Sequence, residues 1–278
     1  MKHPTDTKYT PPFAVLVPLM YIIVLFYHNP IIAQASNTEK TLMAVFAHPD
    51  DEITVGPILH KYAEEGAKVY LVIATDGRFG TNEHSDYEAG DGLAAIRRKE
   101  MQCSSDKLGV ELIHLKYHDQ LRSAEGFDGH IPHIRSLMKD IYDIIEKTQP
   151  DAIITFGPDG WSNHMDHRLV GASVSQAFLS KLWEKPINLF YVGRPANQIE
   201  DSERRILAGQ NIKYLTTKIE YSDKNKDAYI QALACHTSQF GKDAINRLNK
   251  NLNRNNRENV VYLRKFIAPT GNSDTVFD

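Results

Sequence analysis

The chain has 278 residues, of which 42% are hydrophobic and 24% are charged, as in an ordinary globular protein that forms a core without additional cross-links. Its formal net charge is −3, and the sequence carries no basic stripe with interleaved aromatic residues, so nothing indicates a nucleic-acid partner. The length suits one large domain or two small ones.

The N-terminus has the three parts of a secretory signal peptide. Lys2 and Lys8 precede an uncharged apolar run from Phe13 to Tyr27, and the small-x-small triplet Ala33-Gln34-Ala35 follows it. Cleavage after this triplet would make Ser36 the first residue of the mature chain.

The same apolar run has a second interpretation. It is short for a membrane-spanning helix, which needs about 20 residues, but extension through residues 31–33 would allow residues 13–33 to remain as an uncleaved anchor. In both cases we expect the rest of the chain to be exported, into the periplasm or the extracellular space. Residues 1–35 then do not belong to the fold.

From Ser36 onward, short continuous apolar runs alternate with longer amphipathic ones. This alternation predicts an α/β fold, a Rossmann-like three-layer sandwich with a mostly parallel sheet and helices on both faces. Strands are expected at Thr41–Ala47, Lys68–Thr75, Glu111–Leu115, Ala152–Phe156 and Ile187–Val192, and helices at Val55–Glu65, Leu93–Leu108, His130–Thr148 and Arg168–Trp183.

The last third of the chain is less regular. No repeat or internal linker interrupts residues 36–267, which we expect to form one domain, and residues 268–278 are expected to be a loose tail. The elements expected here are a strand at Tyr214–Ile219, helices at Lys224–Cys235 and Gln239–Arg254, and a last strand at Val260–Ile267.

Polar side chains follow four of the predicted strands. Ligands of such folds bind at the carboxyl ends of the parallel strands, so these residues should line one rim of the sheet. They are His48–Glu52, Asp76–Arg78, His118–Asp119 and Gly157–His167.

A divalent cation explains why carboxylates crowd together directly after a buried strand, because it makes their negative charge favourable. His48 and Asp51 are three residues apart at a strand-to-helix turn, and a third ligand can come from His164, Asp166 or His167. Two histidines and one carboxylate with an open position are a catalytic zinc pattern. Asp50 would then be free to act as a general base on water, and His164 to stabilise an oxyanion or protonate the leaving group.

Each of these motifs alone has a simpler explanation. A single histidine in a loop is usually a surface or capping residue, and Asp51 with Glu52 would favour a helix N-terminus through the helix dipole. The combination of two clusters at two strand ends favours the metal site. Competing chemistries find no motif: the chain has no G-x-G-x-x-G turn after its first strand, no Walker A sequence and no G-x-S-x-G elbow.

Six sequence motifs occur in order along the chain. They are "AHPDDE", "ATDGRFG", "IRRKEMQCSSDKLGVELIHL", "YHDQL", an H-x-D-H about 110 residues after the first motif, and "ALACHTSQF". Together they resemble the PIG-L/LmbE family of zinc-dependent N-acetylglucosaminyl deacetylases, and the resemblance covers roughly Thr41 to Phe240.

The resemblance implies a role for each matching residue. Zinc, or another divalent cation, would lie on His48, Asp51 and His167, with Asp50 as the general base. The other roles implied are His164 beside the scissile amide, Arg97, Asp119 and His236 at the sugar, and Asp166 and Glu52 in support of the ligands.

The sequence departs from the family pattern at two positions. Met165 stands where the family usually has proline, which should alter the stiffness of the loop more than ligation. Ser162 stands where some members have tyrosine, so no tyrosine role is assigned.

Other functions and roles remain open at this level. A related zinc amidase acting on another small amide is one, and an exported carbohydrate-binding protein with a vestigial metal site is another, although Asp50 argues against the second. Arg97 and Glu100 can also be an i,i+3 pair on a helix surface, and His236 can be a packed core histidine.

The two cysteines, Cys103 and Cys235, are expected to be buried or partly buried thiols. A disulfide between them is an alternative for an exported protein, and the sequence does not decide between the two.

Overall fold

The computed structural model describes residues 39–278, apart from residues 84, 255–257, 268–270, 272 and 277–278. The predicted signal or anchor segment, residues 1–35, lies outside the described residues, as does part of the predicted tail. No helix in the described part of the chain is long and apolar enough to cross a bilayer. Export and the domain boundaries therefore stay predictions.

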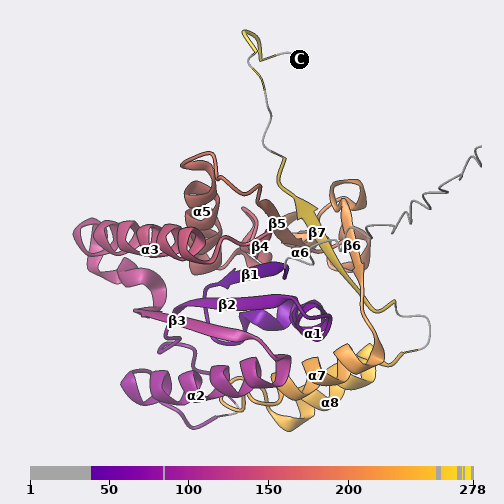
Figure 1. Cartoon of the computed structure of the whole chain (residues 1–278). Coiled ribbons are helices and arrows are strands. Elements are labelled where there is room, and N and C mark those ends of the chain that lie inside the picture. The colour runs from indigo at the N-terminus through magenta and orange to yellow at the C-terminus, as the bar shows by residue number, and fades with distance from the viewer. Residues whose placement is uncertain (1–38, 84, 255–257, 268–270, 272, 277–278) are drawn as a thin grey trace, which may run out of the picture. The chain divides into compact units, whose positions relative to one another are not determined.

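The sheet has seven strands in the order β3-β2-β1-β4-β5-β7-β6 (Figure 1). The first five run parallel, and β7 runs antiparallel to both β5 and β6. The predicted mostly parallel sheet is confirmed. The strands are β1 (Thr41–Phe46), β2 (Lys68–Thr75), β3 (Glu111–Tyr117), β4 (Ala152–Thr155), β5 (Asn188–Gly193), β6 (Thr217–Glu220) and β7 (Val260–Lys265).

Helices cover both faces of this sheet, as predicted for a three-layer α/β sandwich. Figure 1 shows α3 and α5 above the sheet and α1, α2, α7 and α8 below it. The helices are α1 (Gly56–Glu64), α2 (Asp91–Leu108), α3 (Gly126–Thr148), α4 (Gly160–Asn163), α5 (Met165–Leu179), α6 (Ser202–Ala208), α7 (Asp223–Leu233) and α8 (Lys242–Leu252).

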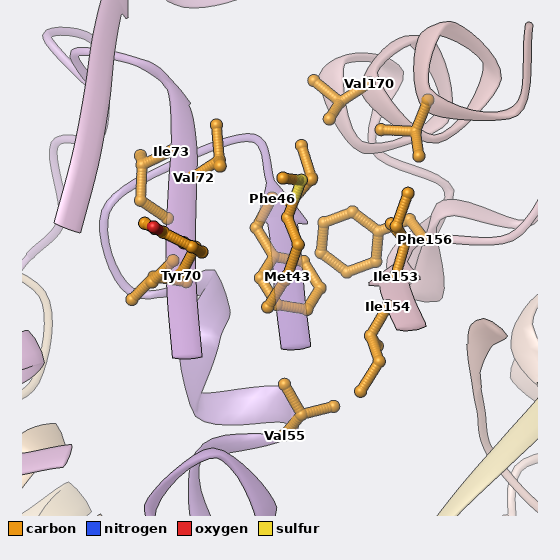
Figure 2. Packing of buried hydrophobic residues seen from close by; sticks show 14 of the residues in the cluster. Met43, Phe46, Val55, Tyr70, Val72, Ile73, Ile153, Ile154, Phe156 and Val170 are labelled. Carbon is orange, nitrogen blue, oxygen red and sulfur yellow. The ribbon is translucent and has the colours of Figure 1, made fainter. Parts of the chain in front are cut away.

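The core is densest around the two central strands, β1 and β4. Met43, Phe46 and Phe156 are fully buried, and the rings of Phe46 and Phe156 meet edge to face at 4.9 Å between centroids. Figure 2 shows these side chains between the strands, with Val170 of α5 close by. Each such side chain contributes roughly 1.5–3 kcal/mol through burial. This packing fixes the strands whose carboxyl ends carry the candidate metal ligands.

The boundaries of several elements differ from those predicted. The third helix begins at Gly126 instead of His130, and α5 ends at Leu179 instead of Trp183. The chain at Ile212–Tyr214 is a 3-10 turn, so β6 begins only at Thr217. Helix α6 was not predicted, because it is short and its large apolar residues, Ile206 and Leu207, are exposed.

Cys103 of α2 and Cys235, which follows α7, form a disulfide with 5.8 Å between their Cα atoms. The expectation of two thiols is therefore wrong, and the alternative holds. The bond joins two segments separated by 132 residues.

Candidate active site

The turn after β1 is built to present a carboxylate. Asp50 has a φ of 103°, a left-handed conformation that is uncommon outside glycine, asparagine and aspartate. The chain then folds back, and Asp51 Oδ2 accepts hydrogen bonds from the backbone N–H groups of Ala47 and His48, at 3.1 and 2.7 Å. The carboxylate of Asp51 is thereby fixed at the carboxyl end of β1.

The second cluster enters from the loop after β4. His164 caps α5 by accepting a hydrogen bond from the Asp166 N–H at 3.3 Å, and His167 lies in the first turn of that helix. The His167 ring stacks on Phe156 at 4.2 Å, with 6° between the planes. Gly160 has a φ of +58°, and a Cβ there would lie 3.1 Å from the Cβ of His167, so the loop needs glycine at this position.

Three side chains converge between these two turns. His48 Nδ1 lies 3.2 Å from His167 Nε2, His167 Nε2 lies 3.0 Å from Asp51 Oδ1, and His48 Nδ1 lies 3.4 Å from Asp51 Oδ2. A tetrahedral zinc ion with ligands at 2.0–2.2 Å spaces those ligand atoms about 3.3–3.6 Å apart. The three residues fit such an ion with small adjustments.

The outer nitrogen of each histidine ring is held by the protein. His167 Nδ1 donates to the Gly160 carbonyl at 2.9 Å. His48 Nε2 lies 3.1 Å from Asp166 Oδ2 and 3.2 Å from Asp119 Oδ1. A proton on each outer nitrogen leaves the inner nitrogen with a lone pair directed at the centre, the arrangement usual for metal-binding histidines.

Two other groupings of ligand atoms lie around His48. One is His48, His164 and His167, and the other is His48, Asp119 and Asp166. In the second, Asp119 accepts from the Phe79 N–H at 2.9 Å and Asp166 from the Gln120 N–H at 2.8 Å. These carboxylates already have acceptor roles that orient His48, whereas Asp51 Oδ1 faces the centre.

The charges of the centre favour a cation. Burial raises the pKa of Asp51, but the hydrogen bonds of His167 and His48, and their positive charges when both nitrogens of each ring hold a proton, bring it well below its ordinary value. Burial is also the largest single effect on Asp119 and raises its pKa, but the hydrogen bond and charge of His48 and the hydrogen bonds from the Phe79 and Gln120 N–H groups together bring it below its ordinary value. Both side chains are therefore carboxylates at neutral pH.

Asp50 is held beside this centre by different partners. Its Oδ2 lies 3.0 Å from Arg97 Nη2, and its N–H donates to Glu52 Oε2 at 3.0 Å. Burial raises the pKa of the Asp50 carboxyl to about 6, against the opposing effect of Arg97. A carboxylate with a raised pKa is suited to accepting a proton near neutral pH.

A buried polar network supports the turn from behind. Glu52 Oε1 accepts from Ser104 Oγ at 2.5 Å and pairs with His236 Nε2 at 2.6 Å. Glu100 accepts from the Ser238 N–H and hydroxyl at 2.7 and 2.6 Å. The network joins α2 and the segment after α7 to the candidate metal turn.

Arg97 completes the support. It donates to the Gly77 carbonyl at 2.9 Å and to the Pro49 carbonyl. A Cβ on either Gly77 or Gly80 would lie 2.3 Å from Arg97 Nη1, so the glycines of this loop leave room for the guanidinium.

The structure thus brings the predicted residues into one region, but at different depths. His48, Asp51 and His167 meet at the centre, Asp50 and Asp119 flank it, and Asp166 and Glu52 lie behind them. His164 is exposed at the edge, with its ring 4.8 Å from that of His48, and burial together with the neighbouring histidines lowers its pKa.

Arg97 is 3% exposed and His236 is 0% exposed, and both bond to protein groups. Their predicted contacts with a sugar stay predictions. The roles of Ser104 and Glu100 were not predicted, and the disulfide beside His236 was one of two alternatives. Their signal lies in the two sequence motifs around Glu100 and around His236.

These observations define the class of the protein. It is a Rossmann-like α/β sandwich with a His–Asp–His group at the carboxyl edge of its parallel strands. Residues 43–178 match the family described as PIG-L, GlcNAc-PI de-N-acetylase. The chain carries a domain of this family, and the resemblance predicted from the sequence is confirmed.

Curated relatives match about half of the chain. A diacetylchitobiose deacetylase of Thermococcus kodakarensis is 31% identical over 139 residues, which are 49% of this chain and 48% of the relative. A probable N-acetyl-α-D-glucosaminyl L-malate deacetylase of Bacillus cereus is 30% identical over 142 residues, 50% of this chain and 61% of the relative. The chain thus spans about half the length of the curated relatives it matches.

Solved structures extend the similarity of the fold to most of the chain. The N,N′-diacetylchitobiose deacetylase of Pyrococcus horikoshii has a TM-score of 0.57 at 24% identity, covering 82% of this chain and 84% of that one. A 4-carboxy-2-hydroxymuconate hydratase of Pseudomonas putida has a TM-score of 0.58 at 15% identity, covering 84% and 99%. Because the same fold carries a hydratase, the activity has to be argued from the site.

Proposed function

We propose that the protein is a zinc-dependent hydrolase that removes an N-acetyl group from an N-acetylglucosamine-type sugar or glycoconjugate. The observation that carries the proposal is the meeting of His48, Asp51 and His167 within 3.0–3.4 Å, with a separate carboxylate, Asp50, beside them. The names of the curated relatives, which are deacetylases of N-acetylated sugars, support the substrate class.

The residues divide the work of amide hydrolysis. His48, Asp51 and His167 would hold the ion, which when bound supplies a Lewis acid for water and for the amide carbonyl. Asp50 Oδ2 is held by Arg97, and its carboxylate takes a proton from the attacking water. The water oxygen adds to the amide carbonyl carbon, the C–N bond breaks, the proton passes from Asp50 to the amine nitrogen, and acetate and the free amino sugar leave.

His164 is the group that stabilises the developing oxyanion. It lies at the exposed edge of the centre, where a substrate arrives, and burial together with its histidine neighbours lowers its pKa. A neutral imidazole there can donate a hydrogen bond to the oxyanion, and it carries no positive charge that would compete with the metal ion for the Asp51 carboxylate.

The first test is acetate release with and without metal. The purified protein is expected to release acetate from N-acetylglucosamine or N,N′-diacetylchitobiose. Removal of metal by a chelator should lower kcat by about 10³-fold or more, since Lewis-acid stabilisation is worth several kcal/mol, and added zinc should restore it. Full activity at a verified zero metal content would contradict the metal role. Binding of metal and sugar without acetate release would instead indicate a carbohydrate-binding protein.

We also propose that the chain is exported. The Lys2/Lys8 region, the apolar run and Ala33-Gln34-Ala35 support it, and a disulfide is typical of oxidising compartments. N-terminal sequencing of the protein from the exported fraction is expected to begin at Ser36. A full-length product in the membrane would favour the uncleaved anchor, and a full-length cytoplasmic product would contradict export.

A further inference from the structure

A cavity of about 820 Å³ lies beside the candidate metal centre, within the range of small-molecule sites. Val192 and Gly193 line it at the carboxyl end of β5, and Tyr262 lines it from β7. In the sheet, Gly193 is paired with Tyr262, and β5 is the parallel neighbour of β4. The cavity is therefore at the same edge of the sheet as the metal ligands.

Two turns are shared between the cavity and the centre. Ile53 and Thr54 line the cavity, and the Thr54 hydroxyl donates to the Asp51 carbonyl at 2.9 Å. Trp161 also lines it, and it directly follows Gly160, whose carbonyl accepts from His167. The cavity and the metal centre are therefore neighbours at this edge of the sheet, connected through these two turns.

The walls have the chemistry of a saccharide site. The half-buried aromatic side chains of Trp161 and Tyr262 offer ring faces, and the Arg194 guanidinium lies 5.7 Å from the Trp161 ring centroid. Gln198 adds an amide, and Glu258 adds a carboxylate that is paired with Lys218 at 3.1 Å. Rings that pack on C–H surfaces, next to donors and acceptors for hydroxyl groups, fit a sugar. An acyl chain would instead bury Arg194 and Gln198 without hydrogen-bond partners, which is costly.

We propose that this cavity binds a sugar unit joined to the acetamido sugar, so that the protein prefers an N-acetylated oligosaccharide to the monosaccharide. The inference rests on the proposed function for the sugar held at the metal centre. Arg194, Glu258 and Tyr262 lie outside residues 43–178, which match the family. The catalytic centre is thus built from the family domain, and the selection of substrate from the C-terminal part of this chain.

The test compares kcat/KM for N,N′,N″-triacetylchitotriose and for N-acetylglucosamine. Arg194→Ala is expected to lower the value for the trisaccharide by about 10–100-fold, the effect of losing hydrogen bonds to a charged group, and Tyr262→Ala by about 3–10-fold. Values for the monosaccharide should stay unchanged in both variants. Arg135→Ala on α3 and Tyr214→Ala, both exposed and outside the cavity lining, are the matched controls and should affect neither substrate.

A binding measurement separates this inference from the proposed function. The chain has two tryptophans, so Trp183→Phe leaves Trp161 as the single fluorescent reporter in the cavity. In an Asp50→Asn background, titration with the trisaccharide should give a saturable change, and Arg194→Ala should raise its Kd by about 10–100-fold. Such a change without acetate release by the Asp50-containing protein would reject the deacetylase and keep the cavity assignment. Acetate release with equal losses on both substrates, or with no loss in either variant, would reject the cavity assignment and keep the deacetylase.

Discussion

Replacing Asp50 by asparagine is expected to lower kcat by about 10²–10⁴-fold, the usual contribution of a general base, while the zinc content stays that of the unaltered protein. Asparagine tolerates the left-handed conformation that Asp50 adopts, with φ 103°. Its side-chain oxygen can still accept from Arg97, which lies 3.0 Å from Asp50 Oδ2. The substitution therefore removes the base without disturbing the turn.

Asp51→Asn is the matched comparison, and it should lose zinc. The backbone N–H groups of Ala47 and His48 bond to Asp51 Oδ2, so the amide oxygen of asparagine would take that place. The amide nitrogen would then face His167 Nε2, which is 3.0 Å from Asp51 Oδ1. An amide N–H₂ group is a donor only and cannot ligate a cation.

Zinc content and kcat measured for both variants decide the assignment. Zinc loss in Asp50→Asn with zinc retained in Asp51→Asn would mean that the two carboxylates have been assigned the wrong way round. Full activity of Asp50→Asn would reject Asp50 as the base.

The parallel part of the fold could be predicted because its strands are continuous apolar runs. Strand β2 is buried on both faces, and its sequence, "KVYLVIAT", is almost entirely apolar. Because helices connect such strands, only a few topologies of the sheet are possible. The outer strand β6 carries no such run. Its burial alternates, and apolar residues of the preceding 3-10 turn extend the sequence pattern, so the predicted start at Tyr214 lies before the observed start at Thr217.

The candidate centre could be predicted because strand ends of a parallel sheet meet at one rim. The buried polar network that supports the centre from behind could not be predicted. Whether Arg97 and His236 face a ligand or the protein depends on how α2 packs against α7, which no local pattern records. The pairing of Cys103 with Cys235 depends on the same packing.

The cavity beside β5 could not be predicted from the sequence. Gly193, Arg194 and Pro195 directly follow a predicted strand, as His48 follows the first. The ends of the first four predicted strands each carry His or Asp residues, whereas the end of the fifth carries no such cluster, so its sequence does not predict a site.

The disulfide gives the second large expected effect. Changing Cys103 and Cys235 together to serine is expected to lower the free energy of unfolding by about 2–5 kcal/mol, because the bond closes a long loop and restricts the unfolded chain. For a unit of this size that corresponds to roughly 5–20 °C in the melting temperature. Thermal unfolding followed by circular dichroism measures the change.

Reduction of the unaltered protein is the control, since it should reproduce the lower melting temperature and should not shift the serine variant further. At temperatures well below the transition, the variant should keep kcat close to that of the unaltered protein. The reason is that the two segments stay joined by hydrogen bonds from Ser238 to Glu100 and by the contact of His236 with Glu52. If kcat falls by more than about 10-fold while the variant is still folded, the disulfide positions the metal turn, and the hydrogen-bonded network alone does not hold it.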